Sequence, residues 1–142
     1  MKKILYLVST LGSSGPTNQL SYIVKYLDRR IFKPLILTLS HEPEASAIKY
    51  FQNVLEVRVE SLGLSRMRGM LSGSAKVKHY IMNNNIDLIH TQGIRADGLI
   101  KRIDVPQVST LRAYPFNDYL TKFGKLKGTL MAFSHMRIIK SN

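Results

Sequence analysis

Short apolar runs alternate with longer amphipathic stretches along the chain, and this alternation constrains the fold more than any other feature of the sequence. Three of the short runs are almost continuously apolar, which is typical of central parallel strands covered on both faces. The run at 54–59 instead alternates valine with charged residues, which is typical of an edge strand. Strands are predicted at 3–9, 35–39, 54–59, 86–90 and 106–110.

The stretches between and after these runs carry the spacing of helices. In the first of them, Leu20, Ile23, Val24 and Leu27 form one apolar stripe. Helices are predicted at 17–28, 44–51, 74–83, 94–102 and 119–140, the last interrupted by two glycines. Strands that alternate with helices predict an α/β fold: one Rossmann-like parallel sheet with helices on both faces and right-handed crossovers.

The length of 142 residues fits a single domain, 1–142, with a core of its own. The chain has no cysteine, which excludes a disulfide scaffold, a zinc finger with thiolate ligands and a cysteine nucleophile. The four histidines show no ligand spacing, so no metal is expected. The apolar run at 4–8 is shorter than the core of a signal peptide, and we interpret it as part of a buried strand.

The charge is strongly basic, because 21 Lys and Arg residues outnumber nine Asp and Glu residues and give a net charge of +12. Such a chain attracts anions: nucleic acid, lipid head groups or phosphorylated small molecules. No nucleic-acid-binding module is recognisable, so nucleic acid is not an expected partner. One basic cluster without acidic residues contains Arg66, Arg68, Lys76 and Lys78.

A second basic cluster occupies residues 112–142, where six basic residues against Asp118 give +5. The predicted last helix in this region carries Phe123, Leu126, Leu130 and Phe133 on one face. We favour packing of this apolar face on the sheet, with solvated lysines opposite. A basic amphipathic helix is also suited to an anionic membrane surface, which is the second interpretation.

The loop after the first predicted strand holds small residues, Gly12, Ser13, Ser14 and Gly15. Small residues let a ligand approach the backbone closely, and the next helix begins with free N–H groups that attract anions. Thr17 and Asn18 are candidate caps of that helix. The spacing is not that of the dinucleotide-binding fingerprint, so a phosphate site and an ordinary flexible loop are both consistent with it.

Polar residues also follow the fourth and fifth predicted strands. His90, Gln92 and Arg95 come after the fourth, at the strand end where open α/β sheets bind ligands. The alternatives are a core histidine with one hydrogen bond and an Arg95 paired with a carboxylate on its own helix. Arg112 follows the fifth strand and is suited to a bidentate contact with a phosphate, or to a surface ion pair with Asp118.

Taken in order, these segments resemble the N-terminal domain of retaining GT-B glycosyltransferases of the family-4 type. The segment 87–97 is similar to the family's fourth strand and its "HxHG" turn, with Gln92 in place of the second histidine. The other matching segments are 11–20 with 26–28, 32–40, 108–111 and 118–128. The resemblance covers nearly the whole chain and implies a two-domain enzyme whose C-terminal, donor-binding domain and last N-terminal strand lie outside this chain.

The resemblance also implies roles for individual residues. The loop at 12–15 approaches the diphosphate of a nucleotide-sugar donor, with the Gly15 N–H as the best single contact. Arg112 stands where many relatives carry a catalytic histidine; it stabilises the leaving diphosphate but cannot act as a base. The acceptor-side cleft residues are Thr17, Asn18, His90, Gln92, Arg95, Asp97 and Tyr114. Without the resemblance, the sequence around Tyr114 favours a side chain that packs against the protein over one that stacks on a ligand.

The resemblance further implies metal-independent transfer with retention, in the synthesis of a cell-surface polysaccharide or glycolipid, in the cytoplasm or peripherally on the inner face of the plasma membrane. The expected partners are the donor-binding domain, in cis or as a separate chain, an acceptor glycan or glycolipid and an anionic membrane. The alternative is a non-catalytic Rossmann-like module that binds a phosphorylated ligand or a partner subunit. An open sheet edge also allows dimerisation.

Overall fold

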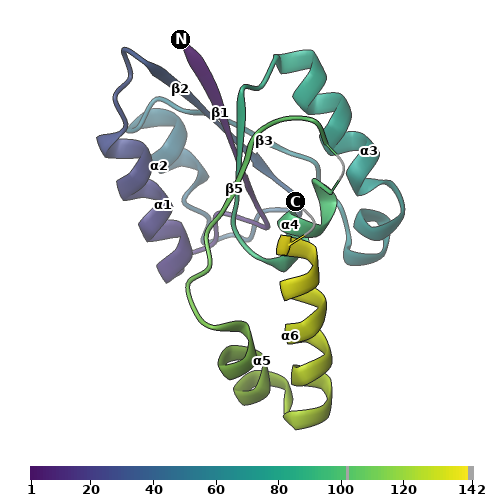
Figure 1. The fold of residues 1–142 in the computed structure, drawn as a ribbon. Helices are drawn as coiled ribbons and strands as arrows, with labels where there is room; N and C mark the ends of the chain where they lie inside the picture. The colour runs from purple at the N-terminus through teal and green to yellow at the C-terminus, as the bar shows by residue number, and fades with distance from the viewer. Residues whose placement is uncertain (102, 141–142) are drawn as a thin grey trace.

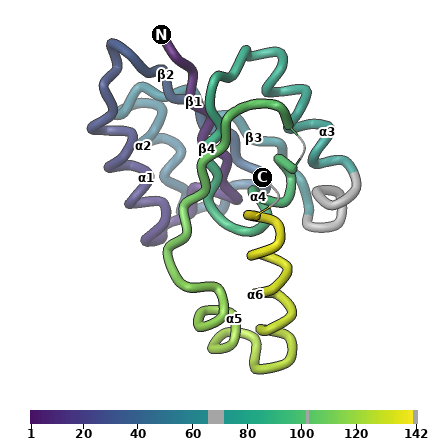
Figure 2. The backbone as a smooth tube through the Cα atoms, viewed as in Figure 1, coloured from purple at the N-terminus to yellow at the C-terminus, as the bar shows by residue number. Residues whose placement is uncertain are grey.

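The chain folds into a five-stranded parallel sheet in the order β3-β2-β1-β4-β5 (Figure 1). The computed structural model describes residues 1–65, 72–101 and 103–140 in full, and residues 66–71 by their backbone alone (Figure 2). The strands are β1 (Lys2–Val8), β2 (Phe32–Thr38), β3 (Arg58–Ser61), β4 (Leu88–Thr91) and β5 (Gln107–Ser109). The predicted Rossmann-like α/β fold is therefore confirmed, with β3 at an edge as its sequence indicates.

Helices cover both faces of the sheet. They are α1 (Gly15–Tyr26), α2 (Ile48–Asn53), α3 (Arg66–Asn84), α4 (Ile94–Leu99), α5 (Pro115–Phe123) and α6 (Lys125–Lys140). Side chains of β1 alternate between two apolar cores: Tyr6 packs with residues of α1 and α2, and Leu7 packs with residues of α3 and α4. This two-sided burial explains why the strand is apolar along almost its whole length.

Some boundaries differ from the prediction for local reasons. Helix α1 begins at Gly15, because Ser14 and not Thr17 or Asn18 is its cap: the Ser14 Oγ accepts a hydrogen bond from the Thr17 N–H at 3.4 Å. Strand β3 begins only at Arg58, because α2 continues to Asn53 and the chain then turns through Glu56 at φ 52°.

Other predicted helices change at their ends. The second starts at Ile48 rather than at 44, and the third is longer, Arg66–Asn84 rather than 74–83. The side chains of Arg66 and Arg68, from the first basic cluster, lie outside the described residues. The predicted end of the fourth helix at 102 also lies outside them, and α4 ends at Leu99.

The predicted last helix is two helices, α5 and α6, that form a hairpin projecting from the sheet (Figure 1). The break lies at Gly124, whose φ of +78° is a left-handed conformation that glycine adopts easily. The expected packing of the apolar face of α6 on the sheet is wrong, because Leu126 and Leu130 are 91% and 70% exposed. Within the described residues, no helix combines the length and apolar character that crossing a bilayer requires.

A close backbone contact holds the two helices of the hairpin together. A Cβ built on Gly128 would lie 2.7 Å from the Leu120 Cα and closer still to the Tyr119 carbonyl oxygen. Gly128→Ala should therefore lower the free energy of unfolding by about 1–3 kcal/mol, because backbone atoms have to move. Urea denaturation measures this change.

Gly98→Ala in α4 is the matched control, since its nearest heavy-atom neighbour would lie at an ordinary 3.8 Å. This control should be neutral or more stable by up to about 1 kcal/mol, because alanine favours helix. Equal unfolding energies for the two variants would contradict the close approach.

Candidate functional site

The loops that follow β1, β4 and β5 meet at the carboxyl edge of the sheet. The chain reverses its direction across the sheet between β1 and β4, which is where open α/β sheets bind ligands. A pocket of about 250 Å³ lies there. Its lining residues are Val8, Ser9, Thr10, Leu11, Ser14, Pro16, Thr17, Leu20, Gln92 and Arg112. Residues about a hundred positions apart therefore share one cavity.

Arg112 lines this pocket, and no carboxylate in the described part of the chain pairs with its charge. Its Nε donates to the Gln19 Oε1 at 2.8 Å, and its Nη2 donates to the Gln92 Oε1 at 2.6 Å. The alternative ion pair with Asp118 is wrong, because Asp118 pairs with Lys122 at 2.8 Å. Partial burial lowers the pKa of Arg112, but the guanidinium stays charged at neutral pH. Two neutral amides thus hold the guanidinium at the pocket without neutralising its charge.

Gln92 brings a second polar group to the pocket wall. Its side chain is 8% exposed, and its Oε1 accepts the bond from Arg112. Its Nε2 is buried and has no hydrogen-bond partner among the described residues. A buried donor without a partner costs about 1–3 kcal/mol, so a ligand oxygen at this atom would be favoured.

The small-residue loop is held in one conformation by its own side chains. The Thr17 Oγ1 donates to the Gly12 carbonyl at 2.6 Å and lies 3.0 Å from the Ser14 Oγ. The Ser13 N–H donates to the Ala45 carbonyl at 3.1 Å. No hydrogen bond within the described residues uses the N–H of Gly15, the first residue of α1. This orientation leaves that N–H for a ligand, as expected at a helix N-terminus.

The segment before α2 makes hydrogen bonds that hold the same loop, a contact that the sequence did not indicate. The Glu42 carboxylate accepts from the Leu11 N–H at 3.0 Å and from the Ser46 Oγ at 2.5 Å. Gly12 and Ser46 also form an isolated antiparallel bridge. Nothing in the local sequence around Glu42 predicts this contact, because it depends on how the loops after β1 and β2 approach each other.

A second, smaller pocket of about 220 Å³ adjoins the first through Pro16 and Arg112, which line both. Its other lining residues are Gly93, Thr110, Leu111, Ala113, Pro115, Asp118, Tyr119, Lys122 and His135. The cleft therefore runs from the loop after β1 to helix α5. Arg112 stands between its two parts.

The remaining predicted site residues fall into different surroundings. The His90 Nε2 lies 2.6 Å from the Thr110 Oγ1, and the His90 ring packs 5.2 Å from that of Tyr6. Burial lowers the pKa of His90, and the positive charge of Arg112 lowers it further, so the ring is neutral at pH 7. These contacts are those of the alternative interpretation, a core histidine with one hydrogen bond.

Arg95 joins α4 to the loops after β2 and β3. It donates to the Ser40 Oγ and to the carbonyls of Leu64 and Ser65, the latter two at 3.2 and 3.3 Å. The alternative interpretation of Arg95, an ion pair with a carboxylate on its own helix, is therefore wrong. Asn18 is exposed on α1. Tyr114 is 60% exposed, with its ring 5.5 Å from that of Phe116.

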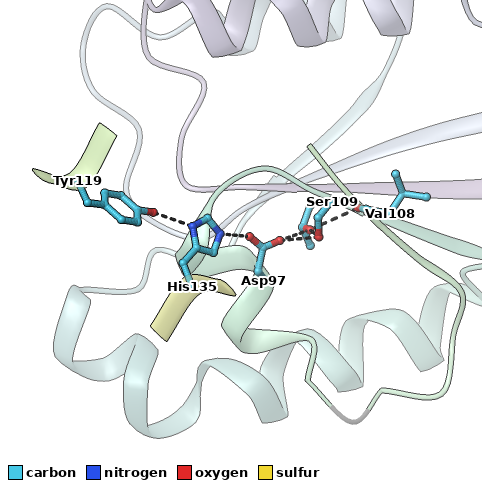
Figure 3. A network of polar contacts seen from close by, with 6 residues as sticks. Asp97, Val108, Ser109, Tyr119 and His135 are labelled. Carbon is cyan, nitrogen blue, oxygen red and sulfur yellow. Dashed lines mark hydrogen bonds and ion pairs between the residues drawn. The ribbon is translucent and has the colours of Figure 1, made fainter. Parts of the chain in front are cut away.

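Asp97 does not face the cleft, because it is 1% exposed within a chain of polar contacts (Figure 3). Its Oδ1 accepts from Thr91 and, at 2.8 Å, from Ser109. Its Oδ2 lies 2.9 Å from the His135 Nε2, and the His135 Nδ1 lies 2.9 Å from the Tyr119 hydroxyl. Its predicted place among the acceptor-side residues is thus corrected: Asp97 anchors the α5–α6 hairpin to the sheet.

The environment of Asp97 favours its charged form. Burial by itself raises the pKa, but hydrogen bonds from His135, Thr91 and Ser109 outweigh burial and hold the pKa of Asp97 below its ordinary value. A lowered pKa in the folded state adds stability above the unfolded pKa of about 4, and that stability is lost as the pH falls through the folded pKa.

Asp97→Asn should therefore lower the free energy of unfolding by about 3 kcal/mol at pH 7, because a neutral amide replaces a buried carboxylate that accepts hydrogen bonds from Thr91, Ser109 and His135. The difference from the unsubstituted protein should shrink as the pH falls below about 4. Urea denaturation across this pH range measures both effects. Asp104→Asn, at an exposed aspartate, is the control and should change little. A difference that is constant with pH would rule out a stabilising Asp97 carboxylate.

Comparison with solved structures places the fold in a known class. A glycosyltransferase from Rickettsia africae aligns over 87% of this chain and 34% of its own, at 16% identity and a TM-score of 0.58. MnaA from S. aureus, in a structure with UDP, aligns over 92% and 35%, at 16% identity and a TM-score of 0.58. MurG from Acinetobacter baumannii aligns over 77% and 34%, at 10% identity and a TM-score of 0.58.

These similarities define the class of the fold: a Rossmann-like domain of the GT-B type. The chain spans about a third of the length of the solved chains it matches. No family model matches the sequence, and no curated protein matches it either. Within the described residues, no three histidine or acidic side chains gather where they could hold a metal ion.

Proposed function

We propose that this chain is the acceptor-side domain of a two-domain, retaining glycosyltransferase of the family-4 type. The observation that carries this proposal is the pocket shared by Ser14, at the cap of α1, and Arg112, after β5. A guanidinium without a described carboxylate partner, beside a helix N-terminus, suits the diphosphate of a nucleotide sugar. The GT-B fold likeness and the resemblance of the sequence support the same assignment.

In this proposal the two sides of the cleft have different tasks. The loop at 12–15, with the Gly15 N–H, approaches the donor diphosphate. Arg112 stabilises the negative charge that develops on the leaving diphosphate, while the sugar gains oxocarbenium character. Gln92 offers its unpartnered amide to a ligand oxygen. The proposed transfer needs no metal or other cofactor, because Arg112 and the helix N-terminus supply positive charge.

The acceptor, a glycan or glycolipid of a cell-surface polysaccharide pathway, is proposed to enter along α1 and α5. Thr17, Asn18 and Tyr114 are the residues assigned to that side, whereas His90 and Arg95 bond to other parts of the chain and have a supporting role. A donor-binding domain, in cis or as a separate chain, closes the cleft from outside. The proposed location is the cytoplasm, peripherally at the inner face of the plasma membrane.

The second candidate is a non-catalytic Rossmann-like module for a phosphorylated ligand or a partner subunit. An Arg112 held in a structural ion pair would favour it, whereas Arg112 bonds to two amides and lines the pocket. This geometry supports the transferase. Strands β3 and β5 form the sheet edges, and dimerisation through one of them stays a prediction.

Arg112→Gln should weaken the binding of UDP and of inorganic pyrophosphate about tenfold, because a charged hydrogen bond to phosphate is lost. Chemical-shift titration of backbone amides measures the dissociation constants, and the largest shifts are expected at Gly12 and Gly15. Arg137→Gln, on exposed α6, removes the same charge and should bind as the unsubstituted chain does. Equally weakened binding in both variants would mean that the ligands are attracted by the net charge of the chain and not by a specific site at Arg112.

The 142-residue chain by itself should show no sugar transfer, since the proposed donor-binding half lies outside it. The measurement is release of UDP from a panel of UDP-sugars, with buffer as the blank. UDP release above the blank that Arg112→Gln abolishes would show that this chain carries a complete catalytic site, and the two-domain proposal would fail.

A further inference from the structure

The tip of the α5–α6 hairpin presents an apolar surface that the described part of the chain does not cover. Leu126, Leu130 and Phe133 follow one another along α6 and are 91%, 70% and 61% exposed. Phe123, at the end of α5, is 43% exposed and continues the same surface. We call these four residues the hairpin stripe. A contiguous apolar stripe of this kind marks an interaction surface, unlike single exposed apolar residues.

The packed side of α6 is the opposite one, so the stripe is not the core face of a misplaced helix. The buried residues of α6 are Gly128, Ala132 and His135. Gly128 lies against α5, and His135 is bonded to Asp97 and Tyr119. Turning the stripe inward would therefore break the buried hydrogen bond between His135 and Asp97.

The charges of the hairpin are mainly positive. Residues 115–140 contain five basic side chains and one acidic side chain, Asp118, which pairs with Lys122. Lys125 and Lys127 flank Leu126 and are exposed, and the Lys127 ammonium lies 5.7 Å from the centre of the Phe123 ring. Lysine stems of this kind cover apolar surface while their ammonium groups stay in a polar layer. The partner of the stripe should therefore combine an apolar interior with a negative surface.

These observations indicate which kind of partner covers the hairpin stripe. Two copies meeting stripe to stripe would bring the lysines of both tips together, with no carboxylate in 119–140 to neutralise them. The hairpin also projects away from the sheet, so its tip can reach an extended flat surface before the rest of the molecule does (Figure 1). An anionic bilayer has both required properties, acyl chains below a layer of phosphate groups.

We propose that the hairpin stripe docks the protein on an anionic lipid surface, with Leu126 and Leu130 entering the acyl boundary and Lys125 and Lys127 facing lipid phosphates. Helix α5 links this surface to the cleft, since Lys122 near its end lines the pocket that Arg112 shares. This proposal specifies the surface behind the peripheral membrane location proposed above, and its consequence for substrate rests on that proposed function: a docked domain would hold its cleft beside acceptors carried on a lipid.

The chain has no tryptophan, so one introduced tryptophan is a unique fluorescent reporter. Leu130→Trp should show a blue-shifted emission with vesicles containing about 30% phosphatidylglycerol, and no shift with pure phosphatidylcholine. Tyr22→Trp is the matched control on α1, because Tyr22 is 62% exposed there, and its emission should not move. Co-sedimentation of the unsubstituted chain with the same vesicles gives an independent measurement of binding.

Further variants of the Leu130→Trp chain distinguish the contribution of charge to vesicle binding from that of the apolar residues. Lys125→Gln with Lys127→Gln should reduce vesicle partitioning about twenty-five-fold, because each lysine near the surface contributes about fivefold. Lys25→Gln with Lys49→Gln removes the same charge from exposed positions on α1 and α2 and should have little effect. Leu126→Ser should reduce partitioning about tenfold. Salt at about 0.5 M should weaken binding, because it screens the lysines.

Three outcomes would overturn the proposal. The first is no binding of the unsubstituted chain to anionic vesicles, and the second is equal binding to phosphatidylcholine. The third is equal loss in the Lys25 and Lys49 control, which would mean general charge attraction. A concentration-dependent dimer that Leu126→Ser abolishes, without vesicle binding, would assign the stripe to a second copy. None of these measurements requires sugar transfer. A negative result would therefore rule out the lipid surface without bearing on phosphate binding at Arg112, which is tested separately.

Discussion

Burial of β1 on both faces is the constraint on which the rest of the structure depends. All its residues from Ile4 to Val8 are buried, with successive side chains in opposite cores. An interior strand covered on both sides is typical of a parallel sheet with helical crossovers. Because the strand order runs in opposite directions on the two sides of β1, crossovers of one hand place helices on both faces. The same arrangement brings the carboxyl ends of β1, β4 and β5 to one edge. The cleft around Arg112 is therefore a consequence of how the central strand is buried.

The polar chain from Ser109 through Asp97 and His135 to Tyr119 has the corresponding role for the hairpin. It ties α5 and α6 to β4, α4 and β5 through a carboxylate that is out of contact with water. A buried charge with three donors is costly to expose, so the hairpin has one preferred position. That position holds Arg112 at the cleft and points the apolar residues of α6 outward. The candidate site and the proposed lipid surface thus share one structural support.

The sequence predicted the fold class, the order of elements and the edge position of β3, because apolar periodicity reports directly on burial. It was less accurate where a single residue decides a local path. Gly124 splits the predicted last helix through a left-handed conformation, and Ser14 starts α1 before the expected caps. Of the candidate site residues, Ser14, Thr17, Gln92 and Arg112 come together in one pocket. Asp97 and Arg95 instead bind other parts of the chain, because their partners are distant in sequence.

The sequence by itself determined the two-sided sheet, the basic charge and the small-residue loop before α1, since each depends on local composition and spacing. Only the tertiary structure decided which polar residues share a cavity and which face of α6 is covered. Periodicity shows that a helix has an apolar face, but it does not show whether another element lies there. The His135–Asp97 pair joins residues 38 positions apart, and it turns the small face of α6 inward and leaves the leucines exposed.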